Sequence, residues 1–201
     1  MAIEVKGIYK SYGSNIVFDG FACHIEDNTV TCLMGPSGQG KTTLLRLIFG
    51  LEKPDGGVIL GMQDRRKSAV FQEDRLCENL SAAANIRLVC QKPLKTNAII
   101  EAMSYVGLAP DCATQTVREM SGGQKRRVAI LRALAAEYDV LFMDEPFKGL
   151  DLETKEMVIS YTKEKIRGKT VLFVTHDETE CAAMGGGIVY IGQNAPGSGS
   201  L

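Results

Sequence analysis

Hydrophobic and polar residues alternate one by one near the start of the chain, as they do in half-buried strands. Ile3 and Val5 are separated by charged residues, which predicts a strand with one buried face. Residues 17–23 fit a second strand, and residues 58–60 resume a strand after the turn signal of residues 54–57. The first 70 residues or so are therefore predicted to be rich in β structure.

Farther along, the pattern changes to short, continuous apolar runs separated by helical segments. Such runs cover residues 30–34, 140–143, 170–174 and 187–191, and they are typical of central parallel strands. Helices are expected over 43–48, from about 121, and over 152–167. Strand–helix alternation of this kind predicts an α/β protein whose parallel sheet is flanked by helices.

The block of residues 73–120 lacks strand alternation and has helical pieces near 85–89 and 97–103. We expect a helical subdomain inserted into an α/β core made of about 1–72 and 121–193, all within a single domain of residues 1–201. The tail, residues 194–201, is of low complexity and is expected to be flexible.

The composition of the chain limits the kinds of molecule that it is expected to bind. The chain has 201 residues, 45% of them hydrophobic, and a net charge of −1, so no overall field attracts nucleic acid or an anionic bilayer. Six cysteines occur without a C-x-x-C pair, and we expect reduced thiols in the cytoplasm rather than a zinc site. No apolar run reaches the ~18–20 residues that span a bilayer, and the charged N-terminus differs from a signal peptide.

A phosphate-binding motif follows the run 30–34. Its residues fit G-x-x-x-x-G-K-[ST] and are Gly35, Pro36, Ser37, Gly38, Gln39, Gly40, Lys41 and Thr42. Glycines let backbone N–H groups approach phosphate oxygens, Lys41 supplies a charge to the β- and γ-phosphates, and Thr42 offers a hydroxyl to Mg²⁺. The strand before the loop and the helix after it favour this interpretation over a chance glycine-rich turn, because the helix N-terminus attracts anions.

Two further patterns gain meaning beside this P-loop. The strand 140–143 ends in Asp144 and Glu145: Asp144 can hold Mg²⁺, and Glu145 can orient a water and accept its proton. Alone, the pair would read as a solvent-facing acidic strand end. Ser121 caps a helix that opens with two glycines, and the alternative is an ordinary capped helix with a basic solvent face at 125–127.

Taken together, these motifs resemble the ATP-binding cassette (ABC) family over nearly the whole chain. Met120 to Gln124 resemble the family signature, with Met120 in the usual Leu position, and Gln72 resembles the Q-loop glutamine. Gly149 to Asp151 resemble the D-loop, although Lys148 and Gly149 replace the more usual small pair. The remaining matches are Tyr12, as the aromatic that stacks on adenine, and His176, as the switch histidine.

This resemblance implies a P-loop NTPase core with a mainly parallel sheet, a small N-terminal antiparallel β-subdomain and the inserted helical subdomain. It also implies an ATPase that uses ATP and Mg²⁺. The residues expected to bind nucleotide are Tyr12, the P-loop residues 35–42, Thr43 and Gln72, with Tyr9 as a competitor for the role of Tyr12. Thr42, Gln72 and Asp144 are implied to hold Mg²⁺.

Glu145 and His176 are the implied catalytic residues. Two cassettes would face each other head to tail as a homodimer or a paired cassette. Ser121, Gly122, Gly123 and Gln124 would then meet the ATP of the opposite subunit, next to the D-loop residue Asp151.

The implied partners are transmembrane permease subunits and, indirectly, a solute-binding protein, with the chain at the cytoplasmic face of the cell membrane and no nucleic acid. Residues 71–76 resemble the Q-loops of bacterial importer cassettes for sulfonate- or nitrate-like solutes. Three alternatives stay open. They are a soluble cassette ATPase acting on the ribosome or DNA, a nucleotide-gated binding module with little turnover, and a small-molecule kinase.

Overall fold

The computed structural model describes residues 2–192, and its contacts group the chain into two compact units. The first unit comprises Met1–Arg65 together with Gly168–Leu201, and the second comprises Arg66–Arg167. The predicted flexible tail, residues 194–201, lies outside the described residues.

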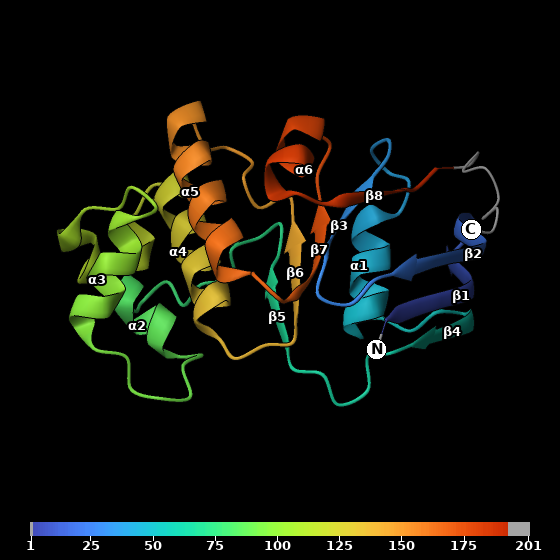
Figure 1. Ribbon diagram of the computed structural model, residues 1–201, viewed down its shortest axis with the longest axis horizontal. Coiled ribbons are helices and arrows are strands. Elements are labelled where there is room, and N and C mark those ends of the chain that lie inside the picture. Colours follow the sequence, from blue (N-terminus) through green and yellow to red (C-terminus); the bar gives the residue numbers. More distant parts are fainter. Residues whose placement is uncertain (1, 193–201) are drawn as a thin grey trace. The chain divides into compact units, whose positions relative to one another are not determined.

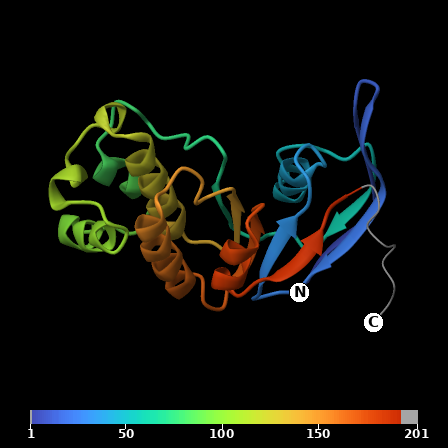
Figure 2. The ribbon, with the colours of Figure 1, turned by 90° about the horizontal axis from the view of Figure 1, so that it is seen from above.

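An antiparallel sheet forms one part of the first unit. Strands β1 (Ile3–Tyr12), β2 (Asn15–Ile25) and β4 (Gly56–Leu60) lie in the order β2-β1-β4. β1 and β2 form one long hairpin (Figure 2), whose register shifts at several points along β1. Alternation places Ile3 and Val5 in the core, as the sequence pattern predicts, and Ile8 is buried as well after a shift in register between Val5 and Ile8.

The other part of the first unit consists of parallel strands and two helices (Figure 1). β3 (Val30–Met34) pairs with both β7 (Thr170–Val174) and β8 (Gly187–Tyr190) in parallel register. Every residue of β7 is buried, as expected for a strand covered on both faces. Helix α1 (Lys41–Phe49) follows β3 and contacts β7, whereas α6 (Glu178–Met184) follows β7 in sequence.

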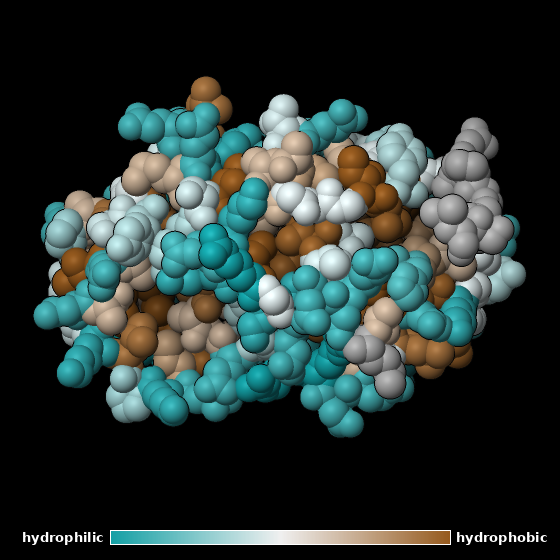
Figure 3. Space-filling view, in the orientation of Figure 1, coloured by the Kyte–Doolittle hydropathy of each residue, from teal (hydrophilic) through white to brown (hydrophobic). Residues whose placement is uncertain are grey.

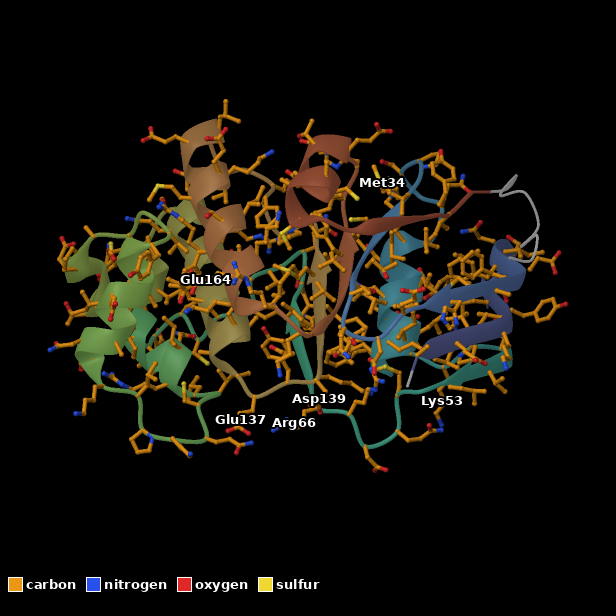
Figure 4. All side chains as sticks on the ribbon, in the orientation of Figure 1. Met34, Lys53, Arg66, Glu137, Asp139 and Glu164 are labelled. Carbon is orange, nitrogen blue, oxygen red and sulfur yellow. The ribbon has the colours of Figure 1, made fainter. Side chains whose placement is uncertain are left out.

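The second unit contains the parallel pair β5 (Lys67–Val70) and β6 (Val140–Asp144). Arg66 fastens the starts of these strands (Figure 4). Its guanidinium donates to both Asp139 oxygens and, at 2.7 Å, to Glu137 Oε2, while its backbone N–H donates to Asp139 Oδ2 at 2.9 Å. These bonds fix the register of the pair and point the carboxyl ends of both strands the same way.

Helices make up the rest of the second unit. They are α2 (Ala82–Arg87), α3 (Thr96–Ser104), α4 (Gly122–Ala135) and α5 (Leu152–Lys165), with short 3₁₀ turns η1 (Pro110–Ala113) and η2 (Val117–Glu119). α2, α3 and α5 all contact α4, and α4 and α5 run side by side in Figure 1. Fully buried Asn85 exchanges hydrogen bonds with the backbone of Cys77, which holds the segment before α2 against that helix.

The predicted α/β fold is confirmed, with parallel strands at the four apolar runs and an antiparallel N-terminal sheet. The expected block 73–120 is helical and lies entirely in the second unit, whose boundaries differ from the predicted core of 1–72 and 121–193. That residues 73–120 form a subdomain of their own stays a proposal. Within residues 2–192, none of the helices has the length and apolar character that crossing a membrane requires.

Candidate functional site

The P-loop connects β3 to α1 in the first unit, and its glycines are needed for the path of the backbone. Gly35 has φ of 144°, and a Cβ there would lie 2.0 Å from the carbonyl oxygen of Ile191. Gly40 has φ of 94°, and a Cβ would lie 2.6 Å from Val17 Cγ1 and 2.8 Å from Phe18 Cζ. Both positions therefore exclude other residues, because the left-handed backbone and the close neighbours each oppose a side chain.

Helix α1 begins directly after this loop with Gly40 as its N-cap, and no side chain accepts a hydrogen bond from its first turn. The first amides of a helix lack intrahelical acceptors and carry the positive end of the helix dipole. Pro36, Ser37 and Gly38 are exposed beside them. The loop and helix start thus offer backbone donors to an anion.

Lys41 is the first residue of α1 and is only 8% exposed. Its Nζ donates to the carbonyl oxygens of Gly35 at 2.7 Å and Pro36 at 2.8 Å. These two bonds bring the ammonium back over the loop that precedes it. The positive charge of Lys41 therefore lies next to the backbone of the P-loop. Thr42 and Thr43, which follow in the first turn, are half-buried.

Tyr12 ends β1 in the same unit and is 47% exposed. Its hydroxyl donates to Glu52 Oε2, and the Nζ of Lys10 lies 5.2 Å from the ring centroid. Burial of the hydroxyl, together with this carboxylate, raises the tyrosine pKa. Tyr9 is similarly exposed and lies opposite Gly56 in the pairing of β1 with β4. The choice of Tyr12 over Tyr9 stays a prediction.

His176 follows β7 and is exposed, and the residues on either side of it are anchored. Thr175 is 1% exposed and donates at 2.7 Å to the carboxylate of buried Glu180. Asp177 caps α6 by accepting from the N–H of Thr179 at 2.9 Å. The chain conformation at His176 is therefore fixed from both sides.

Asp144 and Glu145 lie at the carboxyl end of β6 in the second unit. Asp144 is 3% exposed, whereas the Glu145 side chain is 21% exposed. Glu145 has φ of 45°, which few non-glycine residues adopt and which is common at functional sites. Its Oε2 accepts a hydrogen bond of 2.9 Å from Lys148 Nζ, the residue that departs from the usual D-loop pattern.

Arg126, on α4, is a residue that the sequence reasoning missed. The sequence analysis assigned Arg126 no role and mentioned residues 125–127 only in the alternative of a basic solvent face, but Arg126 is only 6% exposed. Its guanidinium donates to the carbonyl oxygens of Asp144, Glu145 and Pro146 and to that of Phe71. The helical period contains a signal, because Arg126 lies one turn before the buried Ala129 and Ile130.

Gln72 follows β5 with an exposed side chain, and its backbone is fixed by its neighbours. The Phe71 carbonyl accepts from Arg126 at 2.6 Å, and Asp74 Oδ1 accepts from the same guanidinium at 3.0 Å. Gln72 therefore lies on a loop held at both ends.

The signature segment forms the start of α4. Ser121 Oγ accepts from the Gln124 N–H at 3.3 Å, and Gln124 Oε1 accepts from the Ser121 N–H at 2.8 Å, which is a complete capping box. A Cβ at Gly122 would meet nothing within 4 Å, and one at Gly123 would meet only Leu150 Cδ2 at 3.7 Å. Packing within the chain thus does not require these glycines, although each costs a helix about 1 kcal/mol relative to alanine.

Asp151 is the N-cap of α5, accepting from the Thr154 N–H at 2.9 Å. This hydrogen bond, then that of the Thr154 hydroxyl, lowers the pKa of the Asp151 carboxyl. The P-loop, Tyr12 and His176 therefore belong to the first unit. The second contains Gln72, Asp144, Glu145, the signature segment and Asp151.

Comparisons with known proteins agree with this set of motifs. The family described as ABC transporter matches residues 18–148. An Fe(3+) ions import ATP-binding protein of Rhodococcus jostii (strain RHA1) is 36% identical over 202 residues, which cover 92% of this chain and 58% of that protein. An aliphatic sulfonates import ATP-binding protein of the same organism is 36% identical over 187 residues, covering 92% of this chain and 69% of that protein.

Among solved structures, a dimeric, post-hydrolysis ATP-binding cassette bound to ADP and Pi aligns with a TM-score of 0.81 and 28% identity over 94% of both chains. The present chain spans little more than half the length of the iron-import relative. The match to the family nevertheless covers more than half of this chain, and the sulfonate-import relative is covered over two thirds of its length. The chain belongs to the ABC transporter family.

Proposed function

We propose that this chain binds ATP and hydrolyses it to drive solute transport by a membrane ABC transporter. The main support for the proposal is the geometry of the P-loop. Gly35 and Gly40 hold a backbone that no other residue fits, α1 begins without a side-chain cap, and Lys41 lies over the loop. This arrangement gives oriented amides and one positive charge to a polyphosphate.

The site residues have distinct roles in the proposed hydrolysis. Tyr12 stacks on the adenine, and the loop amides and Lys41 bind the phosphates. Glu145 orients the attacking water and accepts its proton, and His176 stabilises charge on the transferred phosphoryl group. Positioning and electrostatics dominate, because the transition state of phosphoryl transfer is loose.

Thr42, Gln72 and Asp144 would hold Mg²⁺. Their hydroxyl, amide and carboxylate oxygens are the hard donors that this ion prefers, and Asp144 lies buried at a strand end, as a metal-binding carboxylate does. Mg²⁺ bound there supplies charge neutralisation of the phosphate oxygens.

We further infer that two copies, or this chain and a similar cassette, pair head to tail around ATP. Gly122 and Gly123 lack a packing role inside the chain, which suits a surface that a second molecule's nucleotide approaches closely. Figure 3 shows hydrophilic side chains interspersed with apolar ones on the face that it presents. Leu152, at the start of α5 next to Asp151, is 73% exposed. A partner surface would cover this end.

The transport role rests on the relatives, whose names describe import of Fe(3+) ions and of aliphatic sulfonates. By this likeness we place the chain at the cytoplasmic face of the membrane, bound to permease subunits. A solute-binding protein would act on it only through those subunits.

Glu145→Gln tests the catalytic assignment. We expect ATP binding to persist while steady-state phosphate release falls by roughly 10²-fold or more, because the amide cannot accept the proton of water. Glu164→Gln, an exposed carboxylate of α5, is the matched control and should turn over normally. Near-normal turnover of Glu145→Gln would remove Glu145 from catalysis.

An affinity pull-down from detergent-solubilised membranes tests the transport role. The bait is Glu145→Gln with ATP and Mg²⁺, and Lys41→Ala serves as a bait that lacks nucleotide. Specific recovery of a polytopic membrane protein is the expected result. Ribosomal or DNA-processing proteins in its place would favour the soluble-cassette alternative.

A further inference from the structure

We propose that Arg126 is a positioning residue that holds the Glu145 loop and the Gln72 loop in one fixed arrangement, so that catalysis depends on both loops together. This inference rests on the proposed function, since it concerns the placement of the proposed catalytic carboxylate. Arg126 itself touches neither reacting atoms nor substrate in the proposed mechanism.

Arg126 binds the backbone at the carboxyl end of β6. Its Nη2 donates to the carbonyl oxygens of Asp144 at 3.0 Å and Glu145 at 2.6 Å, and its Nε donates to that of Pro146 at 2.8 Å. Three consecutive carbonyls thus converge on one guanidinium. They include the carbonyl of Glu145, the residue with the positive φ. Such a backbone persists only when surrounding contacts determine it, and these bonds do so.

Arg126 also forms hydrogen bonds with the loop after β5. Nη1 donates to the Phe71 carbonyl at 2.6 Å and to Asp74 Oδ1 at 3.0 Å, with the Gln72 carbonyl at 3.5 Å. The same planar group therefore bonds residues on both sides of Gln72. A displacement of either loop must break bonds to Arg126 or move it.

Chemistry explains why arginine suits this place. The guanidinium carries five N–H donors in a rigid plane and can serve two loops at once, whereas a lysine ammonium is a point donor. The side chain is 7% exposed, so each bond is formed in a poorly hydrated setting where losing it leaves a buried carbonyl unsatisfied.

Neighbouring basic residues show that this geometry is particular to Arg126. Arg127 donates instead to the carbonyls of Val106, Gly107 and Gly123. Arg132, two turns along α4, donates to the carbonyls of Asp74 and Arg75 at 3.0 and 2.7 Å. Arg132 therefore contacts the Q-loop segment and, within the described part of the chain, forms no hydrogen bond with residues 144–146, which makes it a matched control.

The experiment compares Arg126→Gln with Arg132→Gln in full-length protein, using phosphate release at varied ATP concentration. For Arg126→Gln we expect kcat to fall by roughly 10- to 100-fold with KM for ATP within about threefold, because a misplaced catalytic group slows chemistry more than binding. Arg132→Gln should stay within about twofold of the parent kcat. Arg126→Lys, which keeps the charge without the fork, should recover only part of the loss.

A double variant separates positioning from a general structural role. If Arg126 acts through Glu145, then Arg126→Gln should cause no further loss of kcat when Glu145 is already Gln. An equal fold-loss in both backgrounds would overturn the proposal, as would the same kcat for Arg126→Gln and Arg132→Gln. Failure of the parent protein to release phosphate above Lys41→Ala would instead contradict the proposed function.

Amide hydrogen exchange tests the tie itself without any turnover. Arg126→Gln should speed exchange in both 71–74 and 144–148, whereas Arg132→Gln should speed it only around 73–76. Arg126→Lys provides the same comparison if the glutamine variant does not fold. Unchanged exchange in 144–148 after either Arg126 substitution would overturn the inference.

Discussion

At the scale of single residues, the glycines of the P-loop differ in what restricts them. Gly35 and Gly38 both have positive φ, so a side chain at either is strained. Only Gly35 also faces a backbone atom, the Ile191 carbonyl oxygen at 2.0 Å from an added Cβ. Gly38 faces nothing within 4 Å.

This contrast predicts the effect of two alanine substitutions on stability. Backbone strain costs about 1–3 kcal/mol at either position, and overpacking adds about 1–3 kcal/mol for Gly35→Ala alone. Urea unfolding without nucleotide should therefore rank Gly35→Ala below Gly38→Ala. Equal midpoints would show that the Ile191 segment moves aside without cost.

Some residues of the candidate site were predicted from the sequence, and others were not. The P-loop residues and Asp144 were predicted because each motif is contiguous and follows a recognisable strand. Arg126 was given no role, since a basic side chain beside two others usually faces water. Its burial depends on two loops that are 52 and 19 residues away in the chain.

At the scale of elements, the turn before β4 is fastened to the end of β1 by Asp55. Its carboxylate accepts from the Ser11 N–H at 2.7 Å, from the Ser11 hydroxyl at 3.0 Å and from Lys10 Nζ at 3.2 Å. The Ser11 backbone bond first, and then the Ser11 hydroxyl and Lys10, hold the pKa of this carboxyl below its ordinary value.

The lowered pKa predicts a pH dependence of stability. A carboxyl whose pKa is lower in the folded than in the unfolded chain stabilises the fold above the unfolded pKa of about 3.9, and this contribution disappears as pH falls through the folded pKa. Asp55→Asn should therefore be less stable than the parent at pH 7, with the gap closing below about pH 4. Urea midpoints at pH 7 and pH 3 provide the test, and a gap that is equal at both would contradict it.

The start of α4 combines a structural role with a proposed binding role. Ser121 and Gln124, which the resemblance assigns to a neighbour's ATP, close a capping box on α4. The two roles are compatible, because the box fixes the backbone of the glycines that follow. The capping box therefore also sets how the backbone of these glycines faces a partner.

At the scale of the whole molecule, pairing of two cassettes is the property that remains to be tested. We expect Glu145→Gln to double its mass in sedimentation experiments when ATP and Mg²⁺ are added, because unhydrolysed nucleotide links both copies. Gly122→Arg should fold, since nothing lies within 4 Å of its Cβ, yet remain monomeric with ATP. A dimer of Gly122→Arg would remove this glycine from the interface, and Lys41→Ala serves as the control without nucleotide.

The local chemistry of this protein follows from short stretches of its sequence. Apolar runs located the buried strands, and the fixed spacing of glycine, lysine and threonine defined the P-loop, because both signals depend on neighbours within a few residues. The resemblance to the ABC family followed from the order of such motifs along the chain.

Contacts between groups that lie far apart in the chain depend on how the elements fold together. Periodicity shows that a face of α4 is buried, but not that Arg126 on that face bonds the loops after β5 and β6, or that Tyr12 bonds Glu52. These pairings follow from how strands and helices pack in three dimensions, and residue spacing along the chain does not encode that packing directly.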